Sequence, residues 1–161
     1  MIQMDRLHFD NQLDKILSEA EALIPNENLP DLPFMTEAPD VHDYYRFELD
    51  LWDKGEEIRQ LISNSKKKPN IDQIKRICDI CTNPFAKRGR QSFVMLLGKK
   101  CYAEYAPIIV PFLSDEDIDG HVVDTLYKMG TPDYVAQIQP FTKHKRTWIR
   151  NIAKKYINKY S

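Results

Sequence analysis

The residues best spaced for metal or thiol chemistry are Cys78 and Cys81, which form a Cys-x-x-Cys pair. A structural zinc site needs four ligands, usually two such pairs or one pair with histidines nearby. Only Cys101 and four scattered histidines remain, and none has the spacing of a second ligand pair. Both cysteines also share a helical face with Ile74 and Ile77, and buried cysteine behaves as a small apolar residue. The pattern favours core packing and predicts no bound metal and no cofactor.

A second candidate site is a row of carboxylates, Asp43, Asp50, Asp53 and Glu57. Their spacing of 7, 3 and 4 residues places them on one side of a helix, opposite its apolar stripe. Like charges at such spacing repel one another by roughly a few tenths of a kcal/mol per pair. A basic partner would relieve this repulsion, so we predict that the acidic face docks a protein. The simpler interpretation is a solvated helix face.

The C-terminal segment carries the opposite charge. Lys145, Arg146, Arg150 and Lys154 are its candidate contacts to nucleic-acid phosphate, and the last two share one helix side. Trp148 between them follows the apolar stripe and is predicted to be buried, so exposed aromatic residues do not accompany the cations. The same cations could instead complement the acidic half of the chain.

No catalytic motif accompanies these clusters. The chain has no glycine-rich phosphate loop, no Gly-x-Ser-x-Gly and no His-Glu-x-x-His. No carboxylate pair is marked by its spacing as an acid and base. The sequence therefore predicts a protein that is not an enzyme.

Charge divides sharply along the chain although the net charge is only −1. Residues 1–60 hold 15 acidic and 5 basic side chains, whereas residues 61–161 hold 9 acidic and 18 basic ones. Either the two halves attract each other or the protein presents two differently charged faces to partners.

Length and composition suit one all-helical domain of residues 1–161, since only 5 residues are glycine. No segment approaches the roughly 18 consecutive apolar residues that a membrane helix needs. Met1–Asp10 lacks the apolar run of a signal peptide, and three cysteines fit a reducing compartment. We expect a cytoplasmic protein without membrane contact.

The N-terminal region, residues 1–63, reads as an acidic pair of helices. Apolar periodicity predicts helices over residues 11–24 and 41–63, the second with Asp40 as its N-cap. Four prolines make residues 25–40 an extended loop, in which Phe34 and Met35 are apolar enough to pack against a helix. The lysine-rich residues 64–70 are the best candidate for a boundary.

Shorter helical patterns follow from residue 71 onward, and pieces this short must be held by packing. They cover residues 71–81, 85–99, 102–113, 118–129, 133–142 and 146–160.

Two of these segments repeat one another. Residues 104–113 (EYAPIIVPFL) align with residues 133–142 (DYVAQIQPFT) at an offset of 29, and like residues coincide at Tyr105/Tyr134, Ile109/Ile138, Pro111/Pro140 and Phe112/Phe141. The preceding helices align at an offset of 32, which brings together Gly98 and Gly130 at the expected helix C-termini. The same residue types therefore fill the same inward side twice.

A helix, a glycine turn and a second helix with a period near 30 residues resemble the HEAT and armadillo-like α-solenoids. The resemblance covers residues 70–161 and implies a right-handed stack of antiparallel helical hairpins, an α-α superhelix, behind the acidic N-terminal pair. The sequence departs from the pattern of such repeats in the Asp and Arg that form a ladder between units, for which Asp124 is the nearest match and Arg90 a weaker one. The alternative is an irregular helical bundle with a chance repeat.

Solenoids of this kind commonly act as protein-binding scaffolds. Some bacterial immunity proteins of contact-dependent inhibition systems resemble small helical repeat proteins, and they neutralise basic nuclease toxins by presenting acidic side chains. The acidic N-terminal half leads us to expect an immunity protein, or antitoxin, that blocks such a nuclease. The alternatives are a HEAT-like nucleic-acid-binding or DNA-repair protein, and a metal- or thiol-dependent helical enzyme.

Overall fold

The structure, a computed structural model, describes residues 5–161. The first four residues of Met1–Asp10, the segment that argued against a signal peptide, lie outside the described residues. The chain forms two compact units, a first that ends at Ser92 and a second of Phe93–Ser161. Every regular element within residues 5–161 is helical, and none of these helices is long and apolar enough to cross a bilayer.

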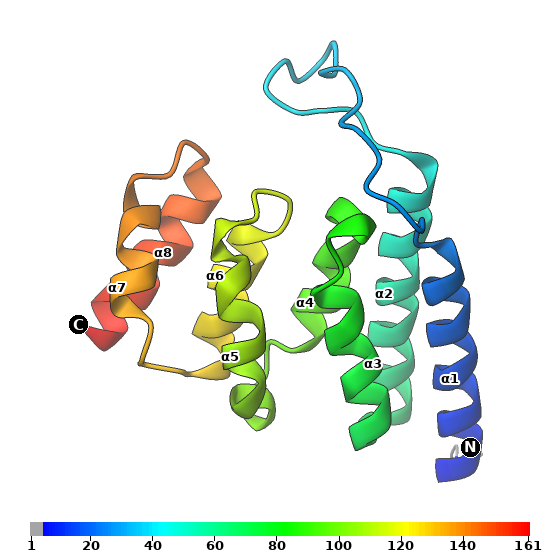
Figure 1. Cartoon of the computed structure of the whole chain (residues 1–161). Coiled ribbons are helices and arrows are strands. Elements are labelled where there is room, and N and C mark those ends of the chain that lie inside the picture. The colour runs from blue at the N-terminus through cyan, green and yellow to red at the C-terminus, as the bar shows by residue number, and fades with distance from the viewer. Residues whose placement is uncertain (1–4) are drawn as a thin grey trace. The chain divides into compact units, whose positions relative to one another are not determined.

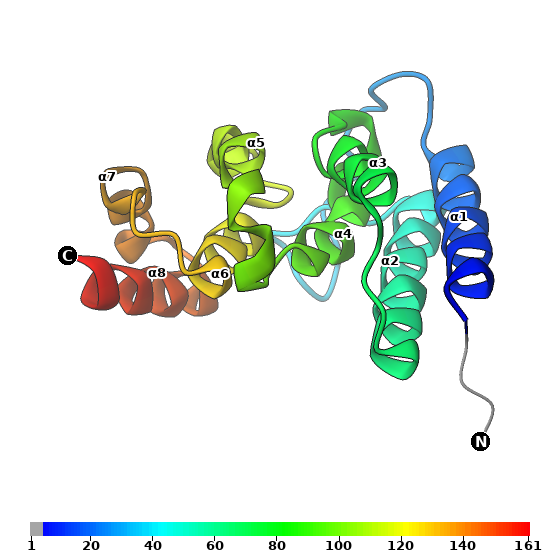
Figure 2. The ribbon, with the colours of Figure 1, turned by 90° about the horizontal axis from the view of Figure 1, so that it is seen from below.

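Three α-helices and one 3-10 helix build the first unit (Figures 1 and 2). They are α1 (Arg6–Leu23), α2 (Arg46–Ser65), α3 (Ile71–Cys81) and η1 (Pro84–Arg90). Helices α1 and α2 lie side by side and antiparallel, and α3 packs against α1. Helix α3 thus belongs to the first unit. The boundary between the units therefore does not fall at the lysine-rich residues 64–70, where the sequence suggested it.

The core of the first unit follows the helical spacing. Helix α1 buries Phe9, Leu13, Leu17 and Ala20, which recur at intervals of three and four residues on one face. The spacing also predicts that Ile71 faces inward, and this prediction is wrong. Ile71 is 80% exposed because it is the first residue of α3. Apolar side chains therefore mark the inward face well along a helix and poorly at its end.

The two N-terminal helices begin at different residues from those predicted. Helix α1 starts at Arg6, five residues early, with the Asp5 carboxylate accepting the His8 N–H at 2.8 Å. Helix α2 starts at Arg46, five residues late, because the Glu48 carboxylate caps the Tyr45 N–H at 2.8 Å. Asp40 is therefore not the N-cap.

The second unit consists of short helices. Helix α4 (Gln91–Leu96) spans the division between the units, and the elements that follow are η2 (Lys100–Tyr105), α5 (Ala106–Ile109), η3 (Val110–Ser114), α6 (Asp119–Met129), α7 (Val135–Ile138), η4 (Gln139–Lys143) and α8 (Thr147–Tyr160). Helices α6 and α8 pack against each other. Their buried faces include Val122, Leu126, Ile149 and Tyr156.

The repeat at an offset of 29 residues also appears in the secondary structure. Helices α5 and α7 have four residues each, and η3 and η4 have five each, all displaced by 29. Pro111 and Pro140 stand in the first turn of η3 and η4, where a missing N–H stops the α-helix and a 3-10 turn continues. The predicted continuous helices over 102–113 and 133–142 are wrong for this reason, whereas Ile109 and Ile138 are both buried as expected.

Two details of the second unit correct the sequence analysis. Gly130 caps α6 with a φ of +74°, while Gly98 does not adopt the left-handed conformation expected for both. Trp148, predicted to be buried, is 43% exposed.

Gly120 sets how closely α8 approaches α6. A Cβ at this position would lie 2.6 Å from Ile149 Cγ1 and 2.6 Å from Trp148 Cη2. We expect Gly120→Ala to destabilise the second unit by about 1–3 kcal/mol, because the overpacked helices must separate. Urea unfolding measures the loss. Gly130→Asn is the control, since its Cβ would meet no atom closer than 3.7 Å and asparagine tolerates a positive φ. Equal effects of the two substitutions would contradict the close approach.

Candidate functional site: the acidic loop

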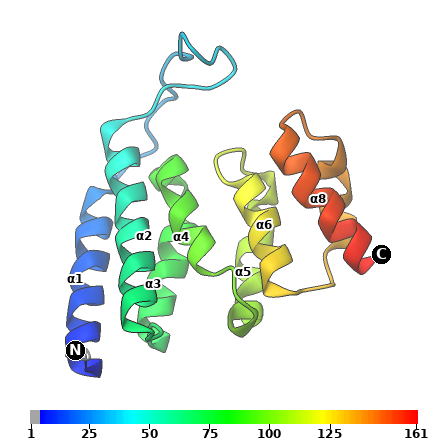
Figure 3. The same ribbon diagram turned by 180° about the vertical axis from the view of Figure 1, so that it is seen from behind.

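The acidic loop, residues 24–45, connects α1 to α2 and projects beyond the ends of both helices (Figures 1 and 3). It contains no lysine and no arginine. Its five carboxylates are all exposed, namely Glu27, Asp31, Glu37, Asp40 and Asp43. The loop therefore presents several exposed negative charges and no cation of its own.

Hydrogen bonds give the loop a defined conformation. Residues 33–43 form a short antiparallel pairing, with the Met35 N–H bonded to the Val41 carbonyl at 2.7 Å and the Asp43 N–H to the Pro33 carbonyl at 2.8 Å. The Tyr45 hydroxyl donates to the Pro30 carbonyl at the base. The four prolines of the sequence thus belong to an ordered projection.

Phe34 is the exposed apolar residue of the acidic loop. Its ring stacks on the His42 ring with centroids 4.1 Å apart, and 57% of its surface is exposed. The prediction that Phe34 packs against a helix is wrong, because the pairing of residue 34 with residue 42 turns its side chain to the solvent. An aromatic ring among carboxylates is a feature of protein-binding surfaces, where aromatic residues are enriched.

An arginine from a distant segment anchors the loop. Arg88 in η1 donates to the carbonyls of His42 and Asp43, both at 2.7 Å, and its Nε lies 3.2 Å from the Glu48 carboxylate. The guanidinium also lies 3.6 Å from the centre of the Tyr44 ring. Glu48 is 1% exposed, so this ion pair is buried at the point where the loop joins α2.

A backbone kink beside Arg88 directs a second cation to the loop. Lys87 has a φ of +49° and a ψ of −137°, a conformation that costs a non-glycine residue of order 1–3 kcal/mol. Its Nζ lies 3.3 Å from Asp31, while its carbonyl accepts the Nε–H of buried Arg90 at 2.7 Å. Strain concentrated where the loop is held is consistent with a functional role for the loop's conformation.

The predicted acidic face of α2 is divided by the structure. Asp43 precedes the helix and belongs to the acidic loop, so it does not share a helix face with the other three. Asp50 pairs with Arg46 at 3.1 Å. Glu57 shares Lys54 with Glu19, at 3.4 and 3.6 Å. Among the described residues, only Asp53 of the three on α2 makes no ion pair, so internal cations relieve the repulsion expected there.

The predicted basic residues are likewise divided. Lys145 and Arg146 precede α8, while Arg150 and Lys154 lie on it. Arg150 donates to the carbonyls of His144 and Lys145 at 2.7 and 3.0 Å, and to the Thr147 hydroxyl at 2.9 Å. Its guanidinium therefore closes the turn before α8, which leaves Lys145 and Lys154 as the exposed cations of the four.

A histidine–aspartate pair that the sequence analysis missed lies at the same turn. His144 Nε2 is 3.4 Å from Asp119 Oδ2, and burial raises the pKa of Asp119. The other ring nitrogen, Nδ1, accepts the Arg146 N–H at 3.0 Å. Both ring nitrogens are thus engaged within the protein, so the pair connects the start of α8 to α6 and leaves no nitrogen free to take a substrate proton.

The Cys-x-x-Cys pair lies in the core as predicted. Cys78 is 4% and Cys81 1% exposed. Burial raises the pKa of the Cys78 thiol to about 11 and that of Cys81 well above its ordinary value, which disfavours the thiolate that binds metals and acts as a nucleophile. Within residues 5–161, no group of three or more metal-ligating side chains is arranged to hold an ion.

Sequence reasoning missed the anchor because its partners are 40 residues apart. One local signal existed: Glu48 stands three residues after Tyr45, the position of the acid in a capping box.

Comparisons of the chain with protein-family models, with curated proteins and with solved structures found no match in any of the three.

Proposed function

We propose that this chain is a non-catalytic protein-binding module whose acidic loop docks onto a basic protein. The observation that carries the proposal is the combination of five exposed carboxylates, no lysine or arginine, and a buried Arg88–Glu48 anchor beneath them. Concentrated charge of one sign speeds association with a partner of opposite charge.

The partner that best fits this chemistry is a nuclease domain. A nuclease must be basic around its active cleft to hold phosphate, so an acidic projection can occupy the cleft in place of the nucleic acid. Exposed Phe34 would supply the apolar contact that protein interfaces place among their polar groups. The biological role that follows is that of an immunity protein, or antitoxin, which keeps a toxic nuclease inactive.

The order of the loop supports tight binding. A loop that must be ordered on association loses affinity through conformational entropy, at about 0.5–1.5 kcal/mol per immobilised side chain. Here the pairing of residues 33–43 and the contacts of Arg88 already set the backbone. Affinity then depends on the carboxylates and on Phe34.

The second unit would serve as a scaffold. We infer that its two similar segments, residues 106–129 and 135–160, are HEAT-like hairpins stacked as in an α-solenoid. The coincidence of α5 with α7 and of η3 with η4 at one offset supports this inference. Repeats of this type present rigid surfaces on which other elements are displayed.

A charge-reversal experiment tests the proposed function. Glu37→Lys with Asp40→Lys changes two exposed loop carboxylates that make no ion pair among the described residues. Against a panel of catalytically inactivated basic nuclease domains, we expect association with the binding domain to slow at least about tenfold at low salt. The salt dependence of the association rate should weaken in parallel. Stopped-flow fluorescence measures both.

The matched control is Glu104→Lys with Asp133→Lys, two exposed carboxylates of the second unit. This variant has the same net charge, so it should associate nearly as the wild type does if the position of the charge matters. Equal slowing by the two variants, or salt-dependent binding to DNA in place of any nuclease domain, would refute the docking role of the loop.

A further inference from the structure

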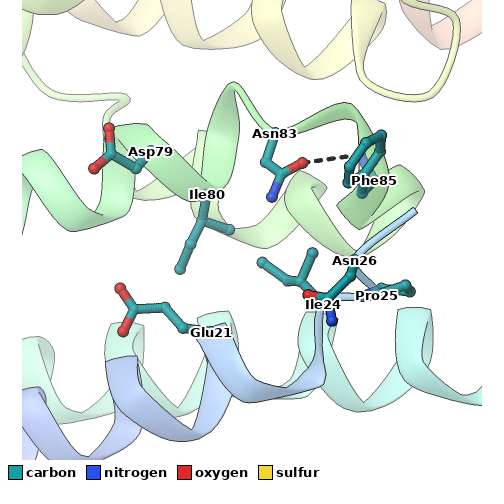
Figure 4. A pocket seen from close by; sticks show the side chains of 8 residues that line it. All are labelled: Glu21, Ile24, Pro25, Asn26, Asp79, Ile80, Asn83 and Phe85. Atoms are coloured by element: carbon teal, nitrogen blue, oxygen red, sulfur yellow. Dashed lines mark hydrogen bonds between the residues drawn. The ribbon is translucent and has the colours of Figure 1, made fainter. Parts of the chain in front are cut away.

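A cavity of about 320 Å³ lies within the first unit, where the end of α1 and the start of the acidic loop meet the end of α3 and the start of η1 (Figure 4). Three exposed polar residues stand around it: Glu21, Asn26 and Asp79. Its size is at the lower limit of small-molecule pockets. The space suits one amino-acid side chain better than a nucleotide or a larger cofactor.

Half of the residues that line the cavity are apolar, namely Ile24, Pro25, Ile80 and Phe85. Ile80 from α3 projects toward Ile24 on the opposite side, and Phe85 closes one end (Figure 4). The Asn83 carboxamide oxygen accepts the Phe85 N–H at 3.0 Å, which fixes the start of η1 at this end. A ligand with methylene groups could therefore replace water against these walls.

The charges around the cavity are not equivalent. Glu21 accepts two hydrogen bonds from the Arg76 guanidinium and is neutralised within the protein. Asp79 is exposed and makes no ion pair within residues 5–161. The cavity therefore offers one uncompensated carboxylate beside walls that are half apolar.

A second depression, of about 350 Å³ between α1 and α2, lacks this property. Its carboxylates, Glu19 and Glu57, share the Lys54 ammonium, and Lys15 adds a further cation to its lining. Of these two sites, the cavity beside Asp79 is the one whose lining includes an exposed carboxylate without an ion-pair partner within residues 5–161.

We propose that the cavity receives an arginine side chain of the protein partner, with the guanidinium on Asp79 and the methylene groups against Ile24. A planar guanidinium forms paired hydrogen bonds to a carboxylate, and it is more weakly hydrated than a lysine ammonium. The Asn26 carboxamide lies beside the cavity as a further polar contact. This assignment rests on the proposed function, because the arginine belongs to the same basic partner.

The test uses the full chain, labelled with ¹⁵N, and N-acetyl-arginine methylamide as the probe. We expect saturable shifts of the Ile80, Asn83 and Phe85 amide signals with a dissociation constant in the millimolar range, as befits one ion pair with small apolar contacts. Asp79→Asn should weaken binding at least about fivefold. The control is Asp72→Asn, which removes an exposed carboxylate from the first turn of the same helix and should leave binding unchanged.

The neutral isostere, N-acetyl-citrulline methylamide, should produce no saturable shifts at these residues. Citrulline binding as tightly as arginine, unchanged binding by Asp79→Asn, or no saturable shift with arginine would each overturn the assignment.

The test is separable from that of the proposed function. The Glu37→Lys with Asp40→Lys variant keeps the cavity and should bind the arginine probe as the wild type does. If this variant also keeps its nuclease partner while the probe still binds, the acidic loop fails as the docking surface and the arginine site stands. If the variant loses the partner and the wild type does not bind the probe, the reverse holds.

Discussion

Replacement of Arg88 by methionine is expected to lower the free energy of unfolding of the first unit by about 3–5 kcal/mol, the usual cost of breaking a buried ion pair. Methionine keeps much of the aliphatic volume but leaves the Glu48 carboxylate, 1% exposed, without its guanidinium. The carbonyls of His42 and Asp43 lose their donors as well. Urea unfolding followed by Trp52 fluorescence in a Trp148→Phe background measures the loss in the first unit.

The control for this prediction is Arg46→Met. Arg46 also pairs with a carboxylate, Asp50 at 3.1 Å, but its side chain is 85% exposed. Exposed pairs contribute roughly 0–1 kcal/mol, so the control should unfold close to the wild type. A similar small loss for both variants would mean that the Arg88–Glu48 pair does not anchor the loop. Loss of the anchor should also speed proteolysis between residues 24 and 45, because an unheld loop opens more often.

The second prediction with a large expected effect is a loss of folding stability at low pH. His121 in the first turn of α6 lies under Trp148, with ring centroids 5.2 Å apart. The pKa of His121 is lowered from 6.5 to about 4, mainly by burial; Asp124 opposes this shift, whereas the charges of Lys128 and Arg146 contribute to it. The folded protein therefore resists protonation of this ring more than the unfolded chain does.

The sign of the pH dependence follows from that difference. A histidine whose folded pKa is depressed contributes stability that is fully present above about pH 6.5 and is lost as the pH falls toward about 4. Since one pKa unit corresponds to about 1.4 kcal/mol, the second unit should lose roughly 3 kcal/mol across this window. The raised pKa of buried Asp119 acts in the opposite direction, because its folded state takes up a proton first.

Comparison with His121→Gln isolates the contribution of this one ring, since all other titrating groups are shared. The difference in unfolding free energy between wild type and variant should shrink by roughly 3 kcal/mol as the pH is lowered from 7 to 4. Urea unfolding followed by Trp148 fluorescence in a Trp52→Phe background gives the free energies at each pH. His8→Gln, at the exposed histidine of α1, should keep the wild-type slope. A parallel pH profile for wild type and His121→Gln would contradict the depressed pKa.

Helical periodicity predicted the architecture of this chain to a useful degree. The apolar face predicted from Ile71 to Cys81 lies on one helix, α3, although Ile71 itself is exposed. The 29-residue repeat reappears in α5, α7, η3 and η4. Such features depend on the spacing of apolar residues and on proline, which act over a few residues. Helix starts were less accurate. The start of α2 depends on a side-chain cap at Glu48 and on the pairing of residues 33–43, which local propensity does not reveal.

The sequence predicted that the candidate site is acidic, but it did not predict where in the structure the site lies. The excess of acid in residues 1–60 pointed to an acidic surface, yet helical spacing assigned it to α2. Cations on α2 itself, Arg46 and Lys54, pair with two of the carboxylates chosen there. Among the described residues, unpaired carboxylates remain at Asp53 and in the adjoining loop, where Asp31 alone has a lysine partner, Lys87.

The sequence by itself determined the helical class, the repeat register and the segregation of charge, because each is a property of neighbouring residues. Only the tertiary structure decided which carboxylates are left free. Arg76 neutralises Glu21 from 55 residues away and Arg88 pairs with buried Glu48 from 40 residues away. Asp79, three residues after Arg76, makes no ion pair with any residue from 5 to 161. Electrostatic energy depends on distance in space and on burial, and neither can be read from spacing along the chain.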